Sequence, residues 1–394
     1  MGKVIECDEK KCYGCTACKN ICPKCAITMK LDEEGFLYPY IDEKLCINCN
    51  LCRKVCPALE KQFSNKKIQE TYAVKLKDEK ERLKSRSGGV FVAISNEILK
   101  NNGSVFGAAF KKDFSVHHIM AENKIERDKC RGSKYIQSNL ENTFKEAYEK
   151  LKENKKVLYT GTPCQIQGLN SYLKLKNMKN DNLYTCDIVC HGVPSTKIYN
   201  DYINFFSKKY KDDVKKFDFR DKSFGWSDHV ETIEFESGKK ISQEYLKNLF
   251  YSNYTLRPRC YECEFTNLER VSDITIADCW GSEKNIPEWN DDKGISLVIL
   301  NTEKGKKIFE KSLNELEYKK INIKDFMQTN LYHPTEKPKN RQEFWDEYKN
   351  KGFKYILKKY GRYTVKDIIK NYTKVYKIKI KFAIKEKLKN KKVF

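Results

Sequence analysis

The sequence predicts an α/β protein in three parts, and three observations support this reading. Two matching cysteine runs fall within the first sixty residues. Short apolar runs then alternate with longer segments of helical period, as in a sheet covered by helices. The last stretch is rich in lysine, with apolar residues at helical spacing. We therefore expect a cysteine-rich unit over 1–60, a mixed α/β unit in two parts over 71–150 and 151–325, and a basic helical tail over 340–394.

The first unit contains two identical cysteine patterns. Each has the spacing C-x2-C-x2-C-x3-C and is followed by proline, Pro23 in one run and Pro57 in the other. This spacing is typical of proteins with two [4Fe-4S] clusters, in which the fourth cysteine of each run ligates the other cluster. The expected ligands are Cys12, Cys15, Cys18 and Cys56 for one cluster, and Cys46, Cys49, Cys52 and Cys22 for the second. The unit is therefore expected to be ferredoxin-like.

Disulfides and structural zinc are the alternatives for these cysteines. No apolar signal segment precedes the first run, so an oxidising compartment is not indicated. Zinc is satisfied by C-x2-C pairs and does not require a third cysteine at the same spacing or a duplicate of the whole set. The pattern therefore favours iron–sulfur clusters.

Strands and helices are expected to alternate after the first unit. Parallel pairing of at least some strands follows from this alternation. Strands are expected over 71–77, 103–110, 155–160, 183–190, 272–281 and 295–302, helices over 88–101, 141–154, 163–176 and 194–210, and a hairpin over 229–245.

Four further cysteines lie where strands end or in a short C-x2-C pair. Cys164 and Cys190 each follow a predicted strand, and Cys260 and Cys263 form the pair. Ligands collect at the carboxyl ends of strands in open α/β sheets, so Cys164 and Cys190 are expected to face one site. At a helix start, the Cys164 thiol is expected to favour its thiolate form. Together the four cysteines supply enough ligands for a third [4Fe-4S] cluster. The alternative for Cys260 and Cys263 is a zinc knuckle or a redox disulfide, and each of the four cysteines alone could also be simply buried.

Two glycine-rich turns offer possible ligand contacts. The first contains Ser87, Gly88 and Gly89 before a helix, an arrangement that suits phosphate, and the second contains Arg131, Gly132, Ser133 and Lys134. Neither turn has a GxGxxG or P-loop pattern, so ordinary helix caps and turns remain the alternative.

Charge and hydropathy set limits on function. The formal net charge is +23, but the lysines are spread along the whole chain and no nucleic-acid-binding motif accompanies them, so no nucleic-acid partner is expected. A mean hydropathy of −0.73 and the absence of a long apolar run indicate a soluble protein, and seventeen cysteines without an export signal indicate the cytoplasm. The tail resembles a basic amphipathic helix that suits an acidic partner or membrane surface, with a packed terminal helix as the alternative.

The chain also resembles a known family through several motifs in the family's order. These are "SRSGGV", "RGSKYIQS", "VLYTGTPCQIQGL", "DIVCHGVPS", "FRDKSFGW", "LRPRCYECEF" and "RVSDITIADCWG". They resemble the beta-subunit family of coenzyme F420 hydrogenases and dehydrogenases, here preceded by a ferredoxin domain.

The resemblance implies an FAD-binding α/β unit that carries its own [4Fe-4S] cluster. Cys164, Cys190, Cys260 and Cys263 become its expected ligands. The two glycine-rich turns become expected flavin contacts, and His191 an expected neighbour of the flavin or of a cluster sulfur, with a helix-capping histidine as the alternative. Cys279 is expected to pack in the core.

The expected function is that of an iron–sulfur flavin-dependent oxidoreductase. Clusters pass single electrons and a flavin exchanges hydride, so together they connect ferredoxin-type carriers to a soluble substrate such as coenzyme F420. Reduced ferredoxin or a redox partner subunit is the expected partner. The alternative is a non-catalytic electron-transfer subunit of a larger hydrogenase or dehydrogenase complex. No acid or base catalyst is identified in the sequence.

Overall fold

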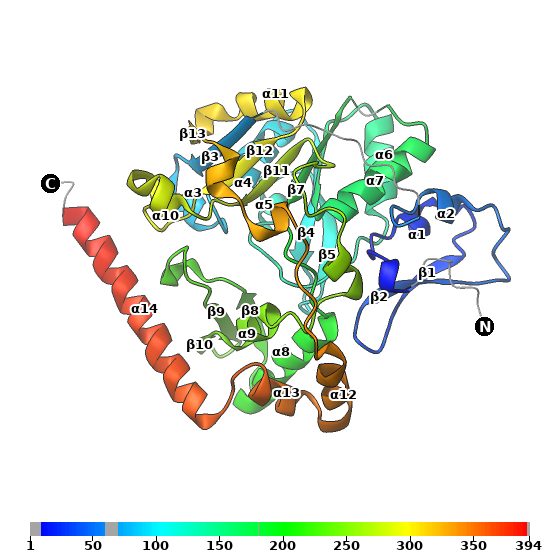
Figure 1. Cartoon of the computed structure of the whole chain (residues 1–394). Coiled ribbons are helices and arrows are strands. Elements are labelled where there is room, and N and C mark those ends of the chain that lie inside the picture. Colours follow the sequence, from blue (N-terminus) through cyan, green and yellow to red (C-terminus); the bar gives the residue numbers. More distant parts are fainter. Residues whose placement is uncertain (1–8, 60–69, 180, 392–394) are drawn as a thin grey trace.

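A computed structural model describes residues 9–59, 70–179 and 181–391. Most of the polar segment that joins the cysteine-rich unit to the rest of the chain lies outside these residues. The protein has the predicted mixed α/β class (Figure 1). Among the described residues, no helix combines the length and apolar character that a membrane span requires.

The N-terminal unit is a small hairpin flanked by two short helices. Strands β1 and β2 pair antiparallel, with Ile27 opposite Ile41. Both isoleucines are buried, and cysteine side chains of both runs pack against them. The elements are η1 (Glu9–Lys11), α1 (Ala17–Ile21), β1 (Ile27–Leu31), β2 (Leu37–Ile41) and α2 (Leu51–Lys54).

An eight-stranded mixed sheet forms the centre of the larger part. Its strand order is β13-β3-β12-β11-β7-β6-β4-β5. The middle pairs β4–β6, β6–β7 and β7–β11 are parallel, which confirms the expected partly parallel sheet, and the outer pairs are antiparallel. The strands are β3 (Glu70–Leu76), β4 (Ser104–Phe110), β5 (Val116–Ala121), β6 (Val157–Gly161), β7 (Leu183–Ile188), β11 (Ile274–Asp278), β12 (Ser296–Leu300) and β13 (Leu316–Lys320).

Helices cover both faces of this sheet. On one face α4 and α11 pack against apolar side chains of the central strands, among them Val105, Leu158 and Val298. On the other face α6 and α7 bury Phe106 and Tyr159, and α1 of the N-terminal unit packs beside them (Figure 1). The helices are α3 (Glu79–Leu83), α4 (Val90–Leu99), α5 (Lys124–Asp128), α6 (Thr143–Lys152), α7 (Pro163–Leu175) and α11 (Glu303–Lys311).

A second lobe has its own three-stranded antiparallel sheet and an aromatic core. Its strand order is β10-β9-β8, and Tyr202, Phe206 and Phe235 are buried within it. The lobe contains α8 (Thr196–Tyr210), β8 (Val214–Asp218), β9 (Glu231–Phe235), β10 (Lys240–Gln243), α9 (Tyr245–Tyr251), α12 (Arg341–Lys351) and α13 (Phe353–Lys359). Short elements lie in the segments between these strands and helices: η2 (Lys222–Phe224), η3 (Pro258–Glu262), α10 (Ser282–Asn285), η4 (Pro287–Trp289), η5 (Leu313–Glu315), η6 (Ile323–Phe326) and η7 (Thr329–Leu331).

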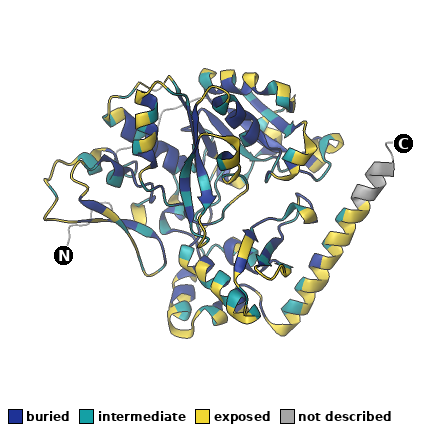
Figure 2. Cartoon of the chain, turned by 180° about the vertical axis from the view of Figure 1, so that it is seen from behind, coloured by how far each residue is buried: buried dark blue, intermediate teal, exposed yellow. Residues whose placement is uncertain are grey.

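The last helix, α14 (Val365–Lys391), runs along the second lobe and extends to the C-terminal end of the chain (Figure 1). Val375 is buried and Ile378 packs beside it, against Phe224 and Val230 of the lobe. Most other described residues of α14 are exposed (Figure 2). The expected basic helical tail is thus a helix with one packed face.

Candidate iron–sulfur and cofactor site

Seven of the eight N-terminal cysteines fall into two groups beside the β1–β2 hairpin, and Cys22 packs in the apolar cluster that both groups share. Burial raises the pKa of Cys15, and the charge of Cys56 is the next largest contribution. Burial also raises the pKa of Cys18, with further contributions from Cys12 and Cys56. These four thiols therefore lie within electrostatic reach of one another, and they are the four that the spacing assigns to one cluster. In the second group, burial raises the pKa of Cys52, and Cys49 and Cys46 raise it further.

A [4Fe-4S] cluster and a single metal ion place different demands on the spacing of their ligands. Within the described residues, no three His, Cys, Asp or Glu side chains lie close enough to hold one metal ion. A four-iron cube is wider than an ion and takes one thiolate at each iron, so its ligands stand farther apart. Two thiol groups packed around one hairpin fit that requirement.

A third group of thiols lies where the carboxyl ends of β6 and β7 meet η3. Cys164 is the second residue of α7, Cys190 follows β7, and Cys260 and Cys263 lie in and directly after η3. All four line one cavity, whose empty volume of about 480 Å³ includes its opening to solvent. Burial raises the pKa of Cys190 well above its usual value, and the charges of Cys260, Cys164 and Cys263 raise it further. The structure thus brings together four cysteines from three distant segments.

The expectation that the helix start favours a Cys164 thiolate is wrong for the metal-free thiol. Burial raises its pKa to about 11. A hydrogen-bond contact with the Thr162 hydroxyl, 3.1 Å from the sulfur, lowers the pKa but does not offset the loss of solvent. Desolvation outweighs the helix dipole here because the packing around the sulfur excludes most of the water.

Arg257 joins the first and third thiol groups. Its Nε donates to the Cys12 carbonyl oxygen at 2.7 Å, and its Nη2 donates to the Leu37 carbonyl oxygen at 3.0 Å. The same guanidinium lowers the pKa of Cys260 after the larger effect of burial, which raises it. A buried cation therefore stands between a loop of the N-terminal unit and the third group. Sequence patterns gave no reason to single out this arginine.

Helix α7 also connects the first and third thiol groups. A Cβ atom added to Gly168 would stand 3.1 Å from the sulfur of Cys15, so only glycine gives this approach without displacement. The same helix carries Cys164 near its start. One helix thus contacts the first group with its middle and the third group with its N-terminal turn.

His191 connects the third group to a set of aromatic rings. It follows Cys190, its Nε2 lies 2.8 Å from Asn253 Oδ1, and burial lowers its pKa, so the ring is neutral at pH 7. Its ring centroid lies 5.0 Å from that of Phe250 and 5.7 Å from that of Tyr251. It does not cap the helix that follows, because Ser195 is the residue whose side chain accepts from the first turn of α8.

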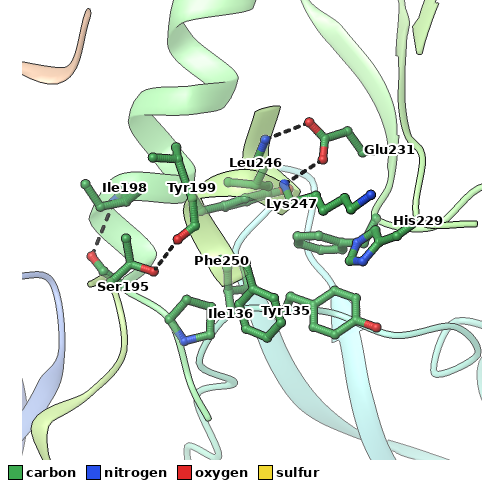
Figure 3. A pocket seen from close by; sticks show the side chains of 14 residues that line it. Tyr135, Ile136, Ser195, Ile198, Tyr199, His229, Glu231, Leu246, Lys247 and Phe250 are labelled. Carbon is green, nitrogen blue, oxygen red and sulfur yellow. Dashed lines mark hydrogen bonds between the residues drawn. The ribbon is translucent and has the colours of Figure 1, made fainter. Parts of the chain in front are cut away.

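These rings continue into a pocket in the second lobe. Tyr135 and His229 lie 5.4 Å apart, and Tyr135 lies 5.0 Å from Phe250. Figure 3 shows Tyr135, His229 and Phe250 on one side of the pocket and Glu231 on another. The Glu231 carboxylate accepts from the backbone N–H groups of Leu246 and Lys247, and burial raises its pKa to about 7.

The first glycine-rich turn is packed tightly against the sheet. Gly88 N–H donates to Ser296 Oγ, and Ser87 Oγ donates to the Ile295 carbonyl oxygen. Gly89 begins α4 with φ of +92°, and a Cβ added to it would stand 2.4 Å from a methyl carbon of Leu76. Ser87 and Gly88 therefore have clear structural roles, and their contact with a flavin stays a prediction.

The second turn is more open. Gly132 has φ of +79° with free space where a Cβ would lie, and Gly132 and Ser133 are exposed. Arg131 donates to Glu81, and Lys134 Nζ donates to the Arg131 carbonyl oxygen at 2.8 Å. Burial lowers the pKa of Lys134 to about 8. The role of this turn toward a flavin stays a prediction. Cys279, by contrast, is buried in an apolar cluster as expected.

The fold and the cysteine groups define an iron–sulfur protein of α/β class. Residues 11–59 match the family model of the 4Fe-4S dicluster domain, which confirms the predicted two-cluster unit. Residues 154–325 match the family model for the C-terminal region of the coenzyme F420 hydrogenase/dehydrogenase beta subunit. The chain therefore carries the C-terminal region of that beta-subunit family behind a dicluster domain, as its motifs predicted.

Among solved structures, a chain of the F420-reducing [NiFe] hydrogenase complex from Methanosarcina barkeri is similar. It shares 20% identity, with 64% of this chain and 82% of that chain covered and a TM-score of 0.47. No curated protein matches the chain.

Proposed function

We propose that this chain is an iron–sulfur flavoprotein oxidoreductase. It passes electrons between [4Fe-4S] clusters and an FAD that exchanges hydride with a soluble molecule, coenzyme F420 or another small organic substrate. The observation that carries the proposal is the third thiol group, Cys164, Cys190, Cys260 and Cys263, which lines one cavity beside the loop of Cys12. Electrons that leave the dicluster unit need a further redox centre in the larger part of the chain.

The proposed roles follow from the contacts. The third thiol group would hold a third [4Fe-4S] cluster, and the rings of His191, Phe250, Tyr251, Tyr135 and His229 would border the flavin. When bound, the flavin supplies two-electron hydride chemistry and the clusters supply one-electron transfer. Arg257 holds the N-terminal loop against η3 and keeps positive charge between the two thiol groups.

The residues around His191 keep the site neutral and apolar. Burial lowers the pKa of His191 and lowers the pKa of His229 to about 2, so neither ring carries a proton at pH 7. The Tyr251 hydroxyl lies 3.3 Å from His229 Nδ1. These groups orient and shield a planar ligand, and no proton transfer to substrate is assigned to them.

Iron content of anaerobically purified protein tests the cluster part of the proposal. The chain should carry about twelve iron atoms, and the double variant Cys260→Ser/Cys263→Ser should lose about four of them. Cys130→Ser is the matched control, because Cys130 is also poorly accessible but stands outside the three groups. Equal iron in the double variant and the control would contradict the third cluster.

Flavin content and reduction test the remainder. Denaturation should release FAD, and stopped-flow mixing should show the bound flavin reduced by ferredoxin or by reduced coenzyme F420. The ferredoxin rate should fall as ionic strength rises, since a chain of charge +23 attracts an acidic carrier. Protein that is fully loaded with iron but releases no flavin would contradict the enzyme reading and leave the cluster reading intact.

A second candidate function, an electron-transfer subunit of a larger complex, is favoured by α14. Its outer face exposes a row of apolar side chains, Val365, Ile369, Tyr372, Tyr376, Ile380 and Ile384, and the helix has ten lysines against two acidic residues. We propose that this row binds an acidic redox partner subunit. Ile369→Ser/Tyr376→Ser should weaken copurification of that subunit, whereas the buried Val375 belongs to the opposite, packed face. Unchanged copurification, or binding to anionic vesicles instead, would contradict this assignment.

A further inference from the structure

Two buried arginines lie where the two lobes meet, at the carboxyl edge of the large sheet. Only 9% of the Arg86 side chain and 5% of the Arg220 side chain are exposed. Both pair with Asp278, the last residue of β11: Arg220 Nη1 lies 3.1 Å from Asp278 Oδ2, and Arg86 Nη2 lies 3.8 Å from it. Both also donate to the carbonyl oxygen of Trp226, at 2.8 Å from Arg86 and 3.4 Å from Arg220. The two guanidinium groups are thus anchored side by side.

These arginines retain donors that the described residues do not satisfy. Nε and Nη1 of Arg86 and Nε of Arg220 are buried without a hydrogen-bond partner among those residues. Leaving a buried donor of a charged group unpaired is costly, so such donors are normally occupied. The Asp278 carboxylate is already engaged, because its Oδ1 accepts from Trp226 Nε1 at 2.9 Å and its Oδ2 accepts from Arg220 Nη1 at 3.1 Å. An acceptor from outside the chain would satisfy all three.

The charges around these donors also point to an anion. Lys222 lies beside them, and its Nζ donates to the carbonyl oxygens of Arg82, Ser87 and Lys293. Burial lowers its pKa to about 7, so Lys222 is partly protonated at pH 7. Two carboxylates oppose the two arginines: Asp278, and Asp218, whose Oδ1 accepts from the Arg220 backbone N–H at 2.9 Å. Protonated Lys222 adds a positive charge that these carboxylates do not balance, in a poorly solvated place where it acts strongly on a ligand.

Aromatic side chains border the two arginines. The Arg220 guanidinium lies 5.2 Å from the ring centroid of Trp280, which stacks on Trp226 at 4.9 Å. Tyr251 is 48% exposed, and His229 lies 5.4 Å from it, so the aromatic rings described above reach from this place toward His191. The two arginines thus lie at one end of this series of aromatic rings, and Cys190 lies at the other end, next to His191.

We propose that Arg86 and Arg220 form a binding site for a phosphate group. Planar guanidinium forks match phosphate oxygens in bidentate fashion, and two of them with unpaired donors suit a phosphate or pyrophosphate. The phosphate comes either from a flavin nucleotide or from a phosphorylated soluble substrate. That choice of source rests on the proposed function, whereas the site itself does not.

Titration calorimetry with inorganic pyrophosphate tests the site directly. Arg86→Gln and Arg220→Gln should each weaken pyrophosphate binding to the full-length, iron-loaded protein by about tenfold or more, the loss expected for charge-assisted hydrogen bonds. Arg86→Lys keeps the charge beside Asp278 but removes the fork, so it should weaken binding to an intermediate extent. Arg127→Gln is the matched control, because Arg127 is equally buried and donates to Asp128, Ser95 and Asn96.

Flavin titrations then identify the source of the phosphate. If a flavin nucleotide supplies it, flavin-depleted Arg86→Gln should lose affinity for FAD about tenfold while riboflavin binding is unchanged. If a substrate supplies it, FAD affinity is unchanged and pyrophosphate still binds the FAD-loaded wild type. Absence of any flavin would defeat the proposed function but leave the pyrophosphate result standing. Pyrophosphate binding that is equal in wild type, Arg86→Gln, Arg220→Gln and Arg127→Gln would overturn the site.

Discussion

Replacing Arg257 by methionine should detach the N-terminal unit from the larger part. The side chain is 1% exposed, and it donates to Cys12 and Leu37 carbonyl oxygens and to Gln137 Oε1. Its guanidinium also lies 4.2 Å from the ring centroid of Tyr38. Methionine fills similar space but donates no hydrogen bond, so the change isolates the polar contacts from the packing.

The expected cost to the contact is about 3–4 kcal/mol. Each hydrogen bond from a charged group contributes roughly 1.5–3 kcal/mol, and the two that cross to Cys12 and Leu37 are lost, but the departure of the buried charge recovers part of the sum. The loss falls on the contact between the two units and not on the core of either. Opening of that contact should therefore become about 10²- to 10³-fold more frequent.

Hydrogen exchange of anaerobically prepared, iron-loaded protein measures this opening. Backbone amides of β2 and of the loop around Cys12 should exchange about 10²- to 10³-fold faster in Arg257→Met, while amides of β6 and β7 in the central sheet should be unchanged. Lys349→Gln is the control: Lys349 pairs with Glu33 of the N-terminal unit at 3.3 Å, but both side chains are largely exposed. An ion pair this exposed contributes little to the stability of the contact, so its loss should not change the exchange rates.

Equal protection of the β2 amides in Arg257→Met and wild type would contradict this prediction. The prediction also fails if β2 and the central sheet lose protection together, because Arg257 would then stabilise the whole chain and not the contact. A rise confined to β2 in both Arg257→Met and Lys349→Gln would mean that surface charge, and not the buried guanidinium, holds the unit.

Two further predictions concern the glycine turns and pH. Gly88→Ala should lower the free energy of unfolding by more than about 3 kcal/mol, because its Cβ would stand 2.1 Å from the Val74 carbonyl oxygen. Gly132→Ala should lower it by only about 1 kcal/mol, through backbone strain. Chemical denaturation compares the two variants, and equal losses would contradict the packing argument. Burial lowers the pKa of Lys222 to about 7 from 10.5, so the folded state binds fewer protons than the unfolded state between those values and stability rises with pH there. Lys222→Met should remove up to about 1.4 kcal/mol per pH unit of that rise, and denaturation curves at pH 7, 8 and 9 with the wild-type slope would refute this.

Local patterns were enough for much of the fold and for the first two cysteine groups. The run around Cys12 and its duplicate around Cys46 fold on tight loops, so their spacing alone specifies which thiols meet. Strands such as 157–161 and 296–300 are short apolar runs buried on both faces, and such runs are visible in any sequence. Strands β5 and β13 were not expected, because they lie at the edges of the sheet, where one side needs no apolar residues.

Tertiary structure alone decided what surrounds the third cysteine group. Spacing could not show that Cys164, Cys190, Cys260 and Cys263 share a cavity, because the three segments that carry them meet only when β6, β7 and η3 pack together. The same holds for Arg257 and for the pair of Arg86 and Arg220, since an arginine in a sequence gives no sign of whether its donors will be satisfied. Burial also reversed the expected ionisation of Cys164: the helix start is encoded locally, but desolvation is a property of everything that packs around it.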